Sequence, residues 1–186
     1  MILNGRNKLQ GKVEVYEIFI GGKVSGKRGR GAEGKGIIAV AEEINVRKTC
    51  RLRLAKIPKA TSKALSGFIE NNIEKSFKIL SDAWTDYTGL DKLGYEHEIQ
   101  NPSVKDSDEE ILSNVHRIAS LLKRWLLGTH QSFLNKNKLE YYPDEFVFRY
   151  NRRTSSSIGL LFMRLIEQAV ITTPGSYKEI IYQNHE

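Results

Sequence analysis

The chain has 186 residues, of which 29 are lysine or arginine and 22 are aspartate or glutamate, so its formal net charge at pH 7 is +7. At this length, a hydrophobic content of 40% is enough to build the core of a single domain, which excludes a disordered, collagen-like or coiled-coil chain. Cys50 is the only cysteine and no apolar stretch is long enough to span a bilayer, so we expect a cytoplasmic protein without disulfides, zinc or a membrane partner.

The charge is unevenly distributed along the chain. Residues 1–60 carry 14 basic and 5 acidic side chains, a net charge of +9, whereas residues 61–112 have a net charge of −6 and residues 113–186 of +4. A basic first third suits a partner with a phosphate backbone, because each cation that neutralises a phosphate releases a counterion and adds affinity.

The chain opens on a strand that is followed by a basic loop. Residues 12–20 are rich in β-branched side chains and alternate only partly, which is typical of a central strand covered on both faces. Between residues 21 and 36, seven glycines separate five cations, a composition that forms neither a stable helix nor a stable strand. We expect a mobile loop that follows a phosphate backbone, although a solvated hairpin loop is the alternative. Its cations are Lys23, Lys27, Arg28, Arg30 and Lys35.

Two further strands are predicted at residues 37–41 and 51–57, joined by a polar turn at residues 43–48. Pro58 closes the last of them, because proline cannot donate a hydrogen bond to a neighbouring strand. The opening of the chain therefore indicates a meander of three antiparallel strands.

A helix and a fourth strand follow the meander. Thr61 can cap a helix that runs to about residue 75, with its apolar side chains on one face. A short apolar strand is predicted at residues 77–80. The order of strand, helix and strand favours a parallel crossover that places this fourth strand beside the first.

The second half of the chain adds a short fifth strand at residues 95–99, a linker at residues 101–110 and a helix at residues 111–127 that ends at Gly128. A last helix is predicted at residues 156–170. The whole order indicates an α/β fold with a mixed sheet of three antiparallel strands plus parallel strands, flanked by helices, and it resembles that of ribonuclease H.

Asp82 is the first candidate for chemistry, since it lies just past the C-terminal end of the predicted strand 77–80. Ligands of open α/β sheets bind at that edge. A carboxylate there can hold Mg²⁺ beside phosphate oxygens, because this hard ion prefers oxygen ligands. An aspartate that only caps the turn after the strand is the alternative, and Asp86 is the rival position.

His116, Lys123 and Arg124 lie on the predicted helix 111–127. His116 and Lys123 are two helical turns apart and share a face. A neutral imidazole can ligate a divalent metal or orient water, and a lysine can pair with a phosphate. The alternatives are a structural histidine and a solvated lysine.

The segment RYNRR at residues 149–153 combines three guanidinium groups with an aromatic ring and an amide. Arginine forks suit phosphates and a tyrosine can stack on an unpaired base, although a salt-bridge cluster with Asp144 and Glu145 is the alternative. The candidates for DNA contact in this half of the chain are Arg124, Arg149, Arg152 and Arg153.

Four segments resemble, in the same order, the catalytic, integrase-like domain of the bacterial insertion-sequence transposases of the ISXO type, members of the DDE superfamily. They are VEVYEIFIGG at 13–22, SDAW at 81–84, HRIASLLKRWLLGTH at 116–130 and DEFVFRYNRR at 144–153. The resemblance divides the chain into an N-terminal remnant at residues 1–10, a catalytic domain at residues 11–170 and a C-terminal tail at residues 171–186.

The resemblance implies a ribonuclease H-like fold, DNA as the partner, and DNA transposition in which Mg²⁺ or Mn²⁺ activates water and then a DNA 3′ hydroxyl. In that family the active set is an aspartate, a second aspartate, a variable third residue and a lysine seven positions later. On this resemblance, Asp82 matches the second aspartate, His116 the third residue and Lys123 the lysine. Asp82 and His116 are then the expected metal ligands.

The first position departs from the family. Where the family has Val-Glu-Val-Asp-Glu, this chain has Tyr16 in place of the aspartate that is expected to bridge both metals. A phenol with a pKa of about 10 is neutral at pH 7 and is a poor ligand for Mg²⁺. Glu17 points to the opposite face of the strand, whereas Glu14 shares the face of Tyr16 but lies roughly 7 Å away.

Three hypotheses follow. The first is a transposase-derived domain for DNA cleavage and strand transfer that is catalytically impaired by Tyr16, and truncated, because family members usually carry an N-terminal zinc-ribbon or helix-turn-helix region for recognition of the element's ends. The second is a non-catalytic DNA-binding or oligomerising remnant, with a second copy or an intact transposase as its partner. The third is a small metal-dependent nuclease in which Glu14 replaces the missing aspartate.

Overall fold

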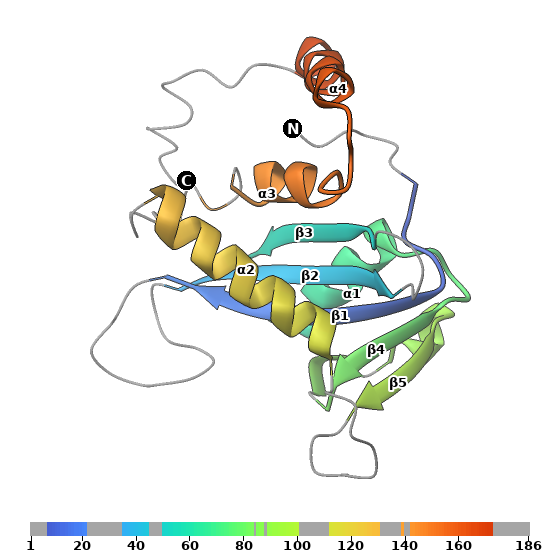
Figure 1. The fold of residues 1–186 in the computed structure, drawn as a ribbon. Coiled ribbons are helices and arrows are strands. Elements are labelled where there is room, and N and C mark those ends of the chain that lie inside the picture. Colours follow the sequence, from blue (N-terminus) through green and yellow to red (C-terminus); the bar gives the residue numbers. More distant parts are fainter. Residues whose placement is uncertain are drawn as a thin grey trace.

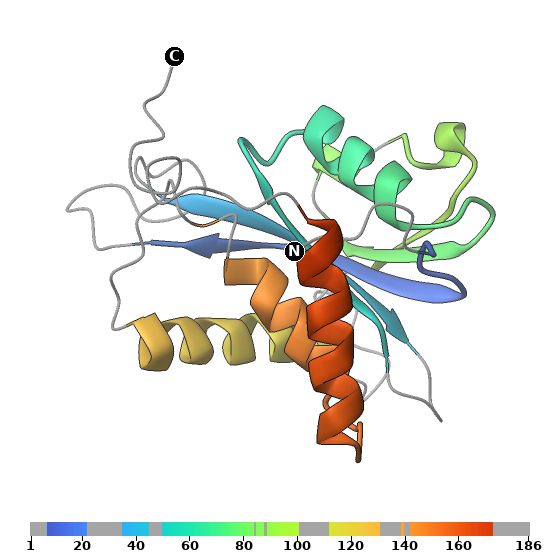
Figure 2. The same cartoon turned by 90° about the horizontal axis from the view of Figure 1, so that it is seen from above.

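The described residues form a mixed sheet with helices on both of its faces (Figures 1 and 2). The computed structural model describes residues 7–21, 35–44, 50–83, 85–87, 89–100, 112–130, 139 and 142–172. In chain order, the elements are β1 (Lys12–Ile20), β2 (Gly36–Ile44), β3 (Leu52–Ile57), α1 (Ser62–Asn72), β4 (Lys78–Asp82), η1 (Thr85–Tyr87), η2 (Asp91–Leu93), β5 (Glu96–Gln100), α2 (Ser113–His130), α3 (Tyr142–Tyr150) and α4 (Ile158–Ile171).

The five strands lie in the order β3-β2-β1-β4-β5, with β1 at the centre. The pairs β1–β2 and β2–β3 are antiparallel, and the pairs β1–β4 and β4–β5 are parallel. Helix α1 makes the crossover from β3 past β2 and β1 to β4, as the order of strand, helix and strand predicts. The predicted α/β mixed sheet is confirmed, and its strand order is that of a ribonuclease H-like fold.

The alternation of side chains along β1 divides the hydrophobic core into two layers. Ile18 and Ile20 pack on one face beneath α2 and α3, whereas Val13 and Val15 pack on the other face beneath α1. Figure 2 shows the sheet between α1 on one side and α2 on the other. Any polar side chain on the face of β1 that carries Ile18 is therefore presented to α2.

Several predicted boundaries differ from the structure. Helix α1 begins as expected, with the Thr61 hydroxyl accepting a hydrogen bond from the Ala64 amide at 3.4 Å, but it ends at Asn72 because Ile73 adopts extended backbone and bridges to Leu9. Gly128 does not end α2, which continues to His130. A glycine stops a helix by adopting the left-handed conformation, and Gly128 is not among the described glycines with positive φ.

Other differences concern the candidate residues. Asp82 is the last residue of β4 and does not follow it, because parallel pairing continues to the level of Asp82 and Gln100. Helix α3 was not predicted as an element. The predicted linker at residues 101–110 lies outside the described residues, as do the loop cations Lys23, Lys27, Arg28 and Arg30.

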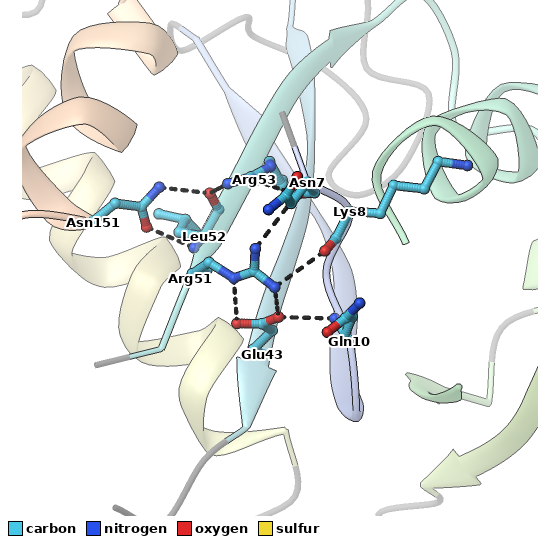
Figure 3. Close-up of polar contacts among 8 residues, drawn as sticks. All are labelled: Asn7, Lys8, Gln10, Glu43, Arg51, Leu52, Arg53 and Asn151. Atoms are coloured by element: carbon cyan, nitrogen blue, oxygen red, sulfur yellow. Dashed lines mark hydrogen bonds and ion pairs between the residues drawn. The ribbon is translucent and has the colours of Figure 1, made fainter. Parts of the chain in front are cut away.

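A polar cluster ties the N-terminal segment and the end of α3 to the sheet (Figure 3). The Arg51 guanidinium binds the Glu43 carboxylate, with 2.8 Å between Nε and Oε2, and donates to the Lys8 carbonyl at 3.1 Å. The amide of Asn151 accepts from the Leu52 N–H at 2.7 Å and donates to the Leu52 carbonyl at 3.1 Å. Because β3 is an edge strand, Asn151 satisfies backbone groups that no further strand reaches.

Within the described part of the chain, none of the helices has the length and apolar character that a transmembrane segment requires.

Candidate functional site

Tyr16 lies in the middle of β1, and Asp82 is the last residue of β4, the parallel neighbour of β1. In the pairing of β1 with β4, Glu14 is level with Leu80. Beyond this level, the next residues on the same face are Tyr16 in β1 and Asp82 in β4, and α2 covers that face. Each side chain is half-buried. Tyr16, at the position where the resemblance implies the first aspartate, is therefore on the strand beside that of Asp82 and on the same face of the sheet.

His116 on α2 lies against Tyr16. The centroids of the two rings are 4.9 Å apart and the ring planes meet at 64°, which is an edge-to-face contact. The His116 side chain is otherwise exposed. The phenol ring therefore fills space between strand and helix where a shorter carboxylate would leave room for an ion.

Lys123 and Arg124 lie further along α2 and are both exposed. Lys123 follows His116 by two turns, so that the two side chains share the helix face that begins at Tyr16. These two cations form an exposed basic surface on α2 that a phosphate backbone can contact.

Glu14 has a structural task that the sequence did not reveal. Its side chain is only 4% exposed, and both of its oxygens accept hydrogen bonds from the first turn of α2. The Asn114 side chain donates to Oε1 and the Val115 amide donates to Oε2, each at 2.9 Å. A carboxylate at a helix N-terminus satisfies amides that have no partner within the helix and complements the helix dipole. Glu14 is thus engaged as the cap of α2, which is an argument against its use as a replacement metal ligand.

A second buried carboxylate lies beside Glu14, since Glu42 on β2 is the cross-strand partner of Glu14. Glu42 is fully buried, and its Oε1 accepts a hydrogen bond from the Tyr150 hydroxyl at 2.6 Å and lies 3.5 Å from the Arg117 guanidinium. Burial raises the pKa of Glu42, against the opposing effects of Tyr150 and Arg117. Burial also raises the pKa of Tyr150, and the hydrogen bond to Glu42 acts in the same direction.

The three arginines of the segment 149–153 are held by local contacts. Arg149 forms an ion pair with Glu145 at 2.9 Å, which is part of the predicted salt-bridge alternative. Arg152 lies over the Phe148 ring at 4.1 Å. Arg153 lies over the Tyr150 ring at 3.8 Å. Tyr150 is only 7% exposed, so its ring is not available to stack on a base.

The donor groups of this site do not fit a pair of magnesium ions. Among the described residues, no three side chains of the types His, Cys, Asp and Glu come together closely enough to hold a metal ion. Asp82 supplies one carboxylate and His116 one imidazole, while the hard ion prefers several oxygen ligands and Tyr16 offers a neutral phenol.

The sheet order, together with an acidic residue at the end of the strand beside β1, defines a ribonuclease H-like α/β domain. Residues 8–151 match the family model of the ISXO2-like transposase domain, and the chain belongs to this family of insertion-sequence DDE transposase domains. The search of curated proteins gave no match. The matched residues include Tyr16, Asp82, His116 and Lys123, whereas α4 lies beyond them.

Proposed function

We propose that this domain derives from an enzyme that cleaves and joins DNA at the ends of an insertion sequence, and that its catalysis is impaired by Tyr16. Membership of the transposase family supports a role in transposition. The observation that supports the impairment is the position of Tyr16, which lies on the strand beside that of Asp82, on the same face of the sheet, and in edge contact with His116. A neutral phenol occupies the place where the family resemblance implies a metal-bridging carboxylate.

In this family Mg²⁺ or Mn²⁺ would supply Lewis-acid activation of the attacking oxygen. The residues that remain for such an ion are Asp82 and His116, of which only Asp82 offers the carboxylate oxygens that Mg²⁺ prefers. The exposure of Lys123 and Arg124 along α2 supports a contact with the DNA backbone that needs no metal. We therefore expect the domain to bind DNA but to cleave it weakly.

Titration calorimetry with Mn²⁺ tests this proposal on the wild-type chain, Tyr16→Asp and Tyr16→Phe. Tyr16→Asp restores a carboxylate beside Asp82 and should tighten metal binding roughly tenfold or more. Tyr16→Phe keeps the ring without the hydroxyl and should bind metal as weakly as the wild type. Equal affinity of the wild type and Tyr16→Asp would contradict the proposal.

A second candidate function is a non-catalytic DNA-binding module that interferes with an intact transposase. The observation that favours it is that Glu14 and Tyr16 of β1 both contact α2. These contacts hold in place the helix that carries the exposed cations.

This candidate predicts binding to duplex DNA in the presence of a metal chelator. Each phosphate contact that releases a counterion adds about −0.9 to the slope of log affinity against log salt, so binding should fall steeply as salt increases. Lys123→Gln and Arg124→Gln should each reduce the slope by about 1, whereas Lys63→Gln, an exposed cation on α1, should leave it unchanged. Fluorescence anisotropy over a range of salt concentrations measures the slope, and no binding at low salt would exclude this function.

A further inference from the structure

Helix α4 presents a wide apolar surface to solvent. Ser157 caps the helix, its hydroxyl accepting from the Leu160 amide at 3.3 Å. Four residues at intervals of one turn form a ridge along α4, and Met163 widens it. Their exposed fractions are 83% for Ile158, 61% for Phe162, 55% for Met163, 42% for Ile166 and 79% for Val170. We call these five residues the α4 stripe.

The rest of the domain covers mainly the side of α4 next to the stripe. Leu161, Leu165 and Gln168 point toward α3 across a groove of about 660 Å³, and Gln168 is only 7% exposed. Ile158 and Phe162, at the edge of the α4 stripe, also line this groove. Figures 1 and 2 place α4 on the side of α3 that faces away from the sheet. The charged residues Arg164 and Glu167 pair with each other at 2.8 Å and lie outside the α4 stripe. The α4 stripe is therefore an apolar face that the described residues leave largely exposed.

The size of this face can be compared with the area that a specific protein interface requires. If a fully exposed large side chain presents roughly 150–250 Å², the five residues present on the order of 500 Å² of apolar surface. The largest patch on a typical monomer is about 300–600 Å² and is often functional. Two such faces in contact would remove on the order of 1,000 Å² from water, which is about the lower limit for a specific protein interface.

We propose that the α4 stripe is the surface through which two copies of this chain associate. The stripe carries no charge, so it has nothing to offer a phosphate backbone, and its natural complement is another apolar ridge of the same spacing. A two-fold axis near the middle of α4 would set Phe162 of each copy near Ile166 of the other, and Ile158 near Val170. Large side chains would meet large side chains along the whole ridge.

This inference does not depend on the proposed handling of DNA, because it is carried by α4 alone and α4 lies beyond the residues matched to the transposase family. Failure of one proposal leaves the other intact. The occupant that competes with a second copy is the chain's own segment 173–186, which lies outside the described residues. Coverage by that segment would leave the chain monomeric.

Sedimentation equilibrium of the full chain, without DNA, distinguishes these outcomes. We expect a dimer whose dissociation constant rises about tenfold or more in Phe162→Glu and in Ile166→Glu, because each change buries a charge in the interface. The matched control is Leu160→Glu, since Leu160 is 65% exposed on the same helix but lies between Arg164 and Glu167 around the axis. Leu160→Glu should dimerise as the wild type does.

Circular dichroism and thermal unfolding of each variant show that it is folded, as expected for substitutions at exposed positions. A wild-type chain that is monomeric at every concentration would overturn the proposal. A dimer that Phe162→Glu and Ile166→Glu leave as tight as the wild type would also overturn it.

Discussion

Glu42 is a carboxylate that the fold keeps in an environment unfavourable to its charge. Its side chain is fully buried, and burial raises its pKa despite the hydrogen bond from Tyr150. Because the pKa is raised above the ordinary value of 4.5, protonated Glu42 favours the folded state. Its contribution to stability is therefore present below that ordinary value and is lost as the pH rises through the folded-state pKa.

We expect Glu42→Gln to remove this loss, since glutamine keeps an oxygen that accepts from the Tyr150 hydroxyl and carries no charge at any pH. The free energy of unfolding, measured by urea denaturation from pH 4 to pH 8, should fall less steeply with rising pH in Glu42→Gln than in the wild type.

The matched control is Tyr150→Phe, which leaves Glu42 buried without its donor and should destabilise the protein at pH 7 by about 1–3 kcal/mol. Identical pH profiles for Glu42→Gln and the wild type would show that Glu42 keeps an ordinary pKa.

The first turn of helix α2 is held by a strand residue, Glu14. Glu14 accepts from both the Asn114 side chain and the Val115 amide, and it reaches α2 from β1 across about a hundred positions of sequence. This contact sets the first turn of α2, which carries His116 against Tyr16. The position of His116 beside Tyr16 therefore depends on the capping of α2 by Glu14.

We predict that Glu14→Ala lowers the free energy of unfolding by about 2–4 kcal/mol, because two hydrogen bonds to a buried charged group are lost. Asn114→Ala removes one of the two and should cost about half as much. Chemical denaturation of the three proteins measures the differences.

A different result would restore the hypothesis of a nuclease that uses Glu14. If Glu14→Gln left stability unchanged and abolished a metal-dependent nicking activity, Glu14 would act as a ligand and its role as a cap would be secondary.

The strands of the sheet and the apolar face of α2 were predictable from sequence because their signals are local. Residues 12–20 were expected as a strand and form β1 with the same bounds. Asp82, His116 and Lys123 are candidates through motif spacing and family resemblance, and in the structure Tyr16 lies against His116, on the strand beside that of Asp82.

Other features escaped prediction because their causes are distant in the sequence. Asp82 belongs to β4 because its strand pairs with β5, which the apolar run alone could not show. The engagement of Glu14 and Glu42 depends on partners about a hundred residues away. Helix α3 is short, and the sequence indicated only a segment for phosphate contact at residues 149–153, whereas Phe146, Val147 and Tyr150 of the helix are buried.

Over the whole molecule, the net charge of +7 combines a basic first third with an acidic middle that contains Asp82. The described part of the chain adds exposed cations on α2 and an uncharged face on α4. These features suit a domain that contacts DNA along α2 and another copy of itself through α4. Such a domain should bind DNA but cut it poorly, because Tyr16 replaces the first aspartate of the family's active set.

The most direct measurement is a strand-nicking assay on supercoiled DNA with Mg²⁺ and with Mn²⁺, run on the wild type, Tyr16→Asp and the double variant Tyr16→Asp with Asp82→Ala. We expect little nicking by the wild type, faster nicking by Tyr16→Asp, and loss of that gain in the double variant. A wild-type rate equal to that of Tyr16→Asp, and abolished by Asp82→Ala in the wild-type chain, would contradict this expectation.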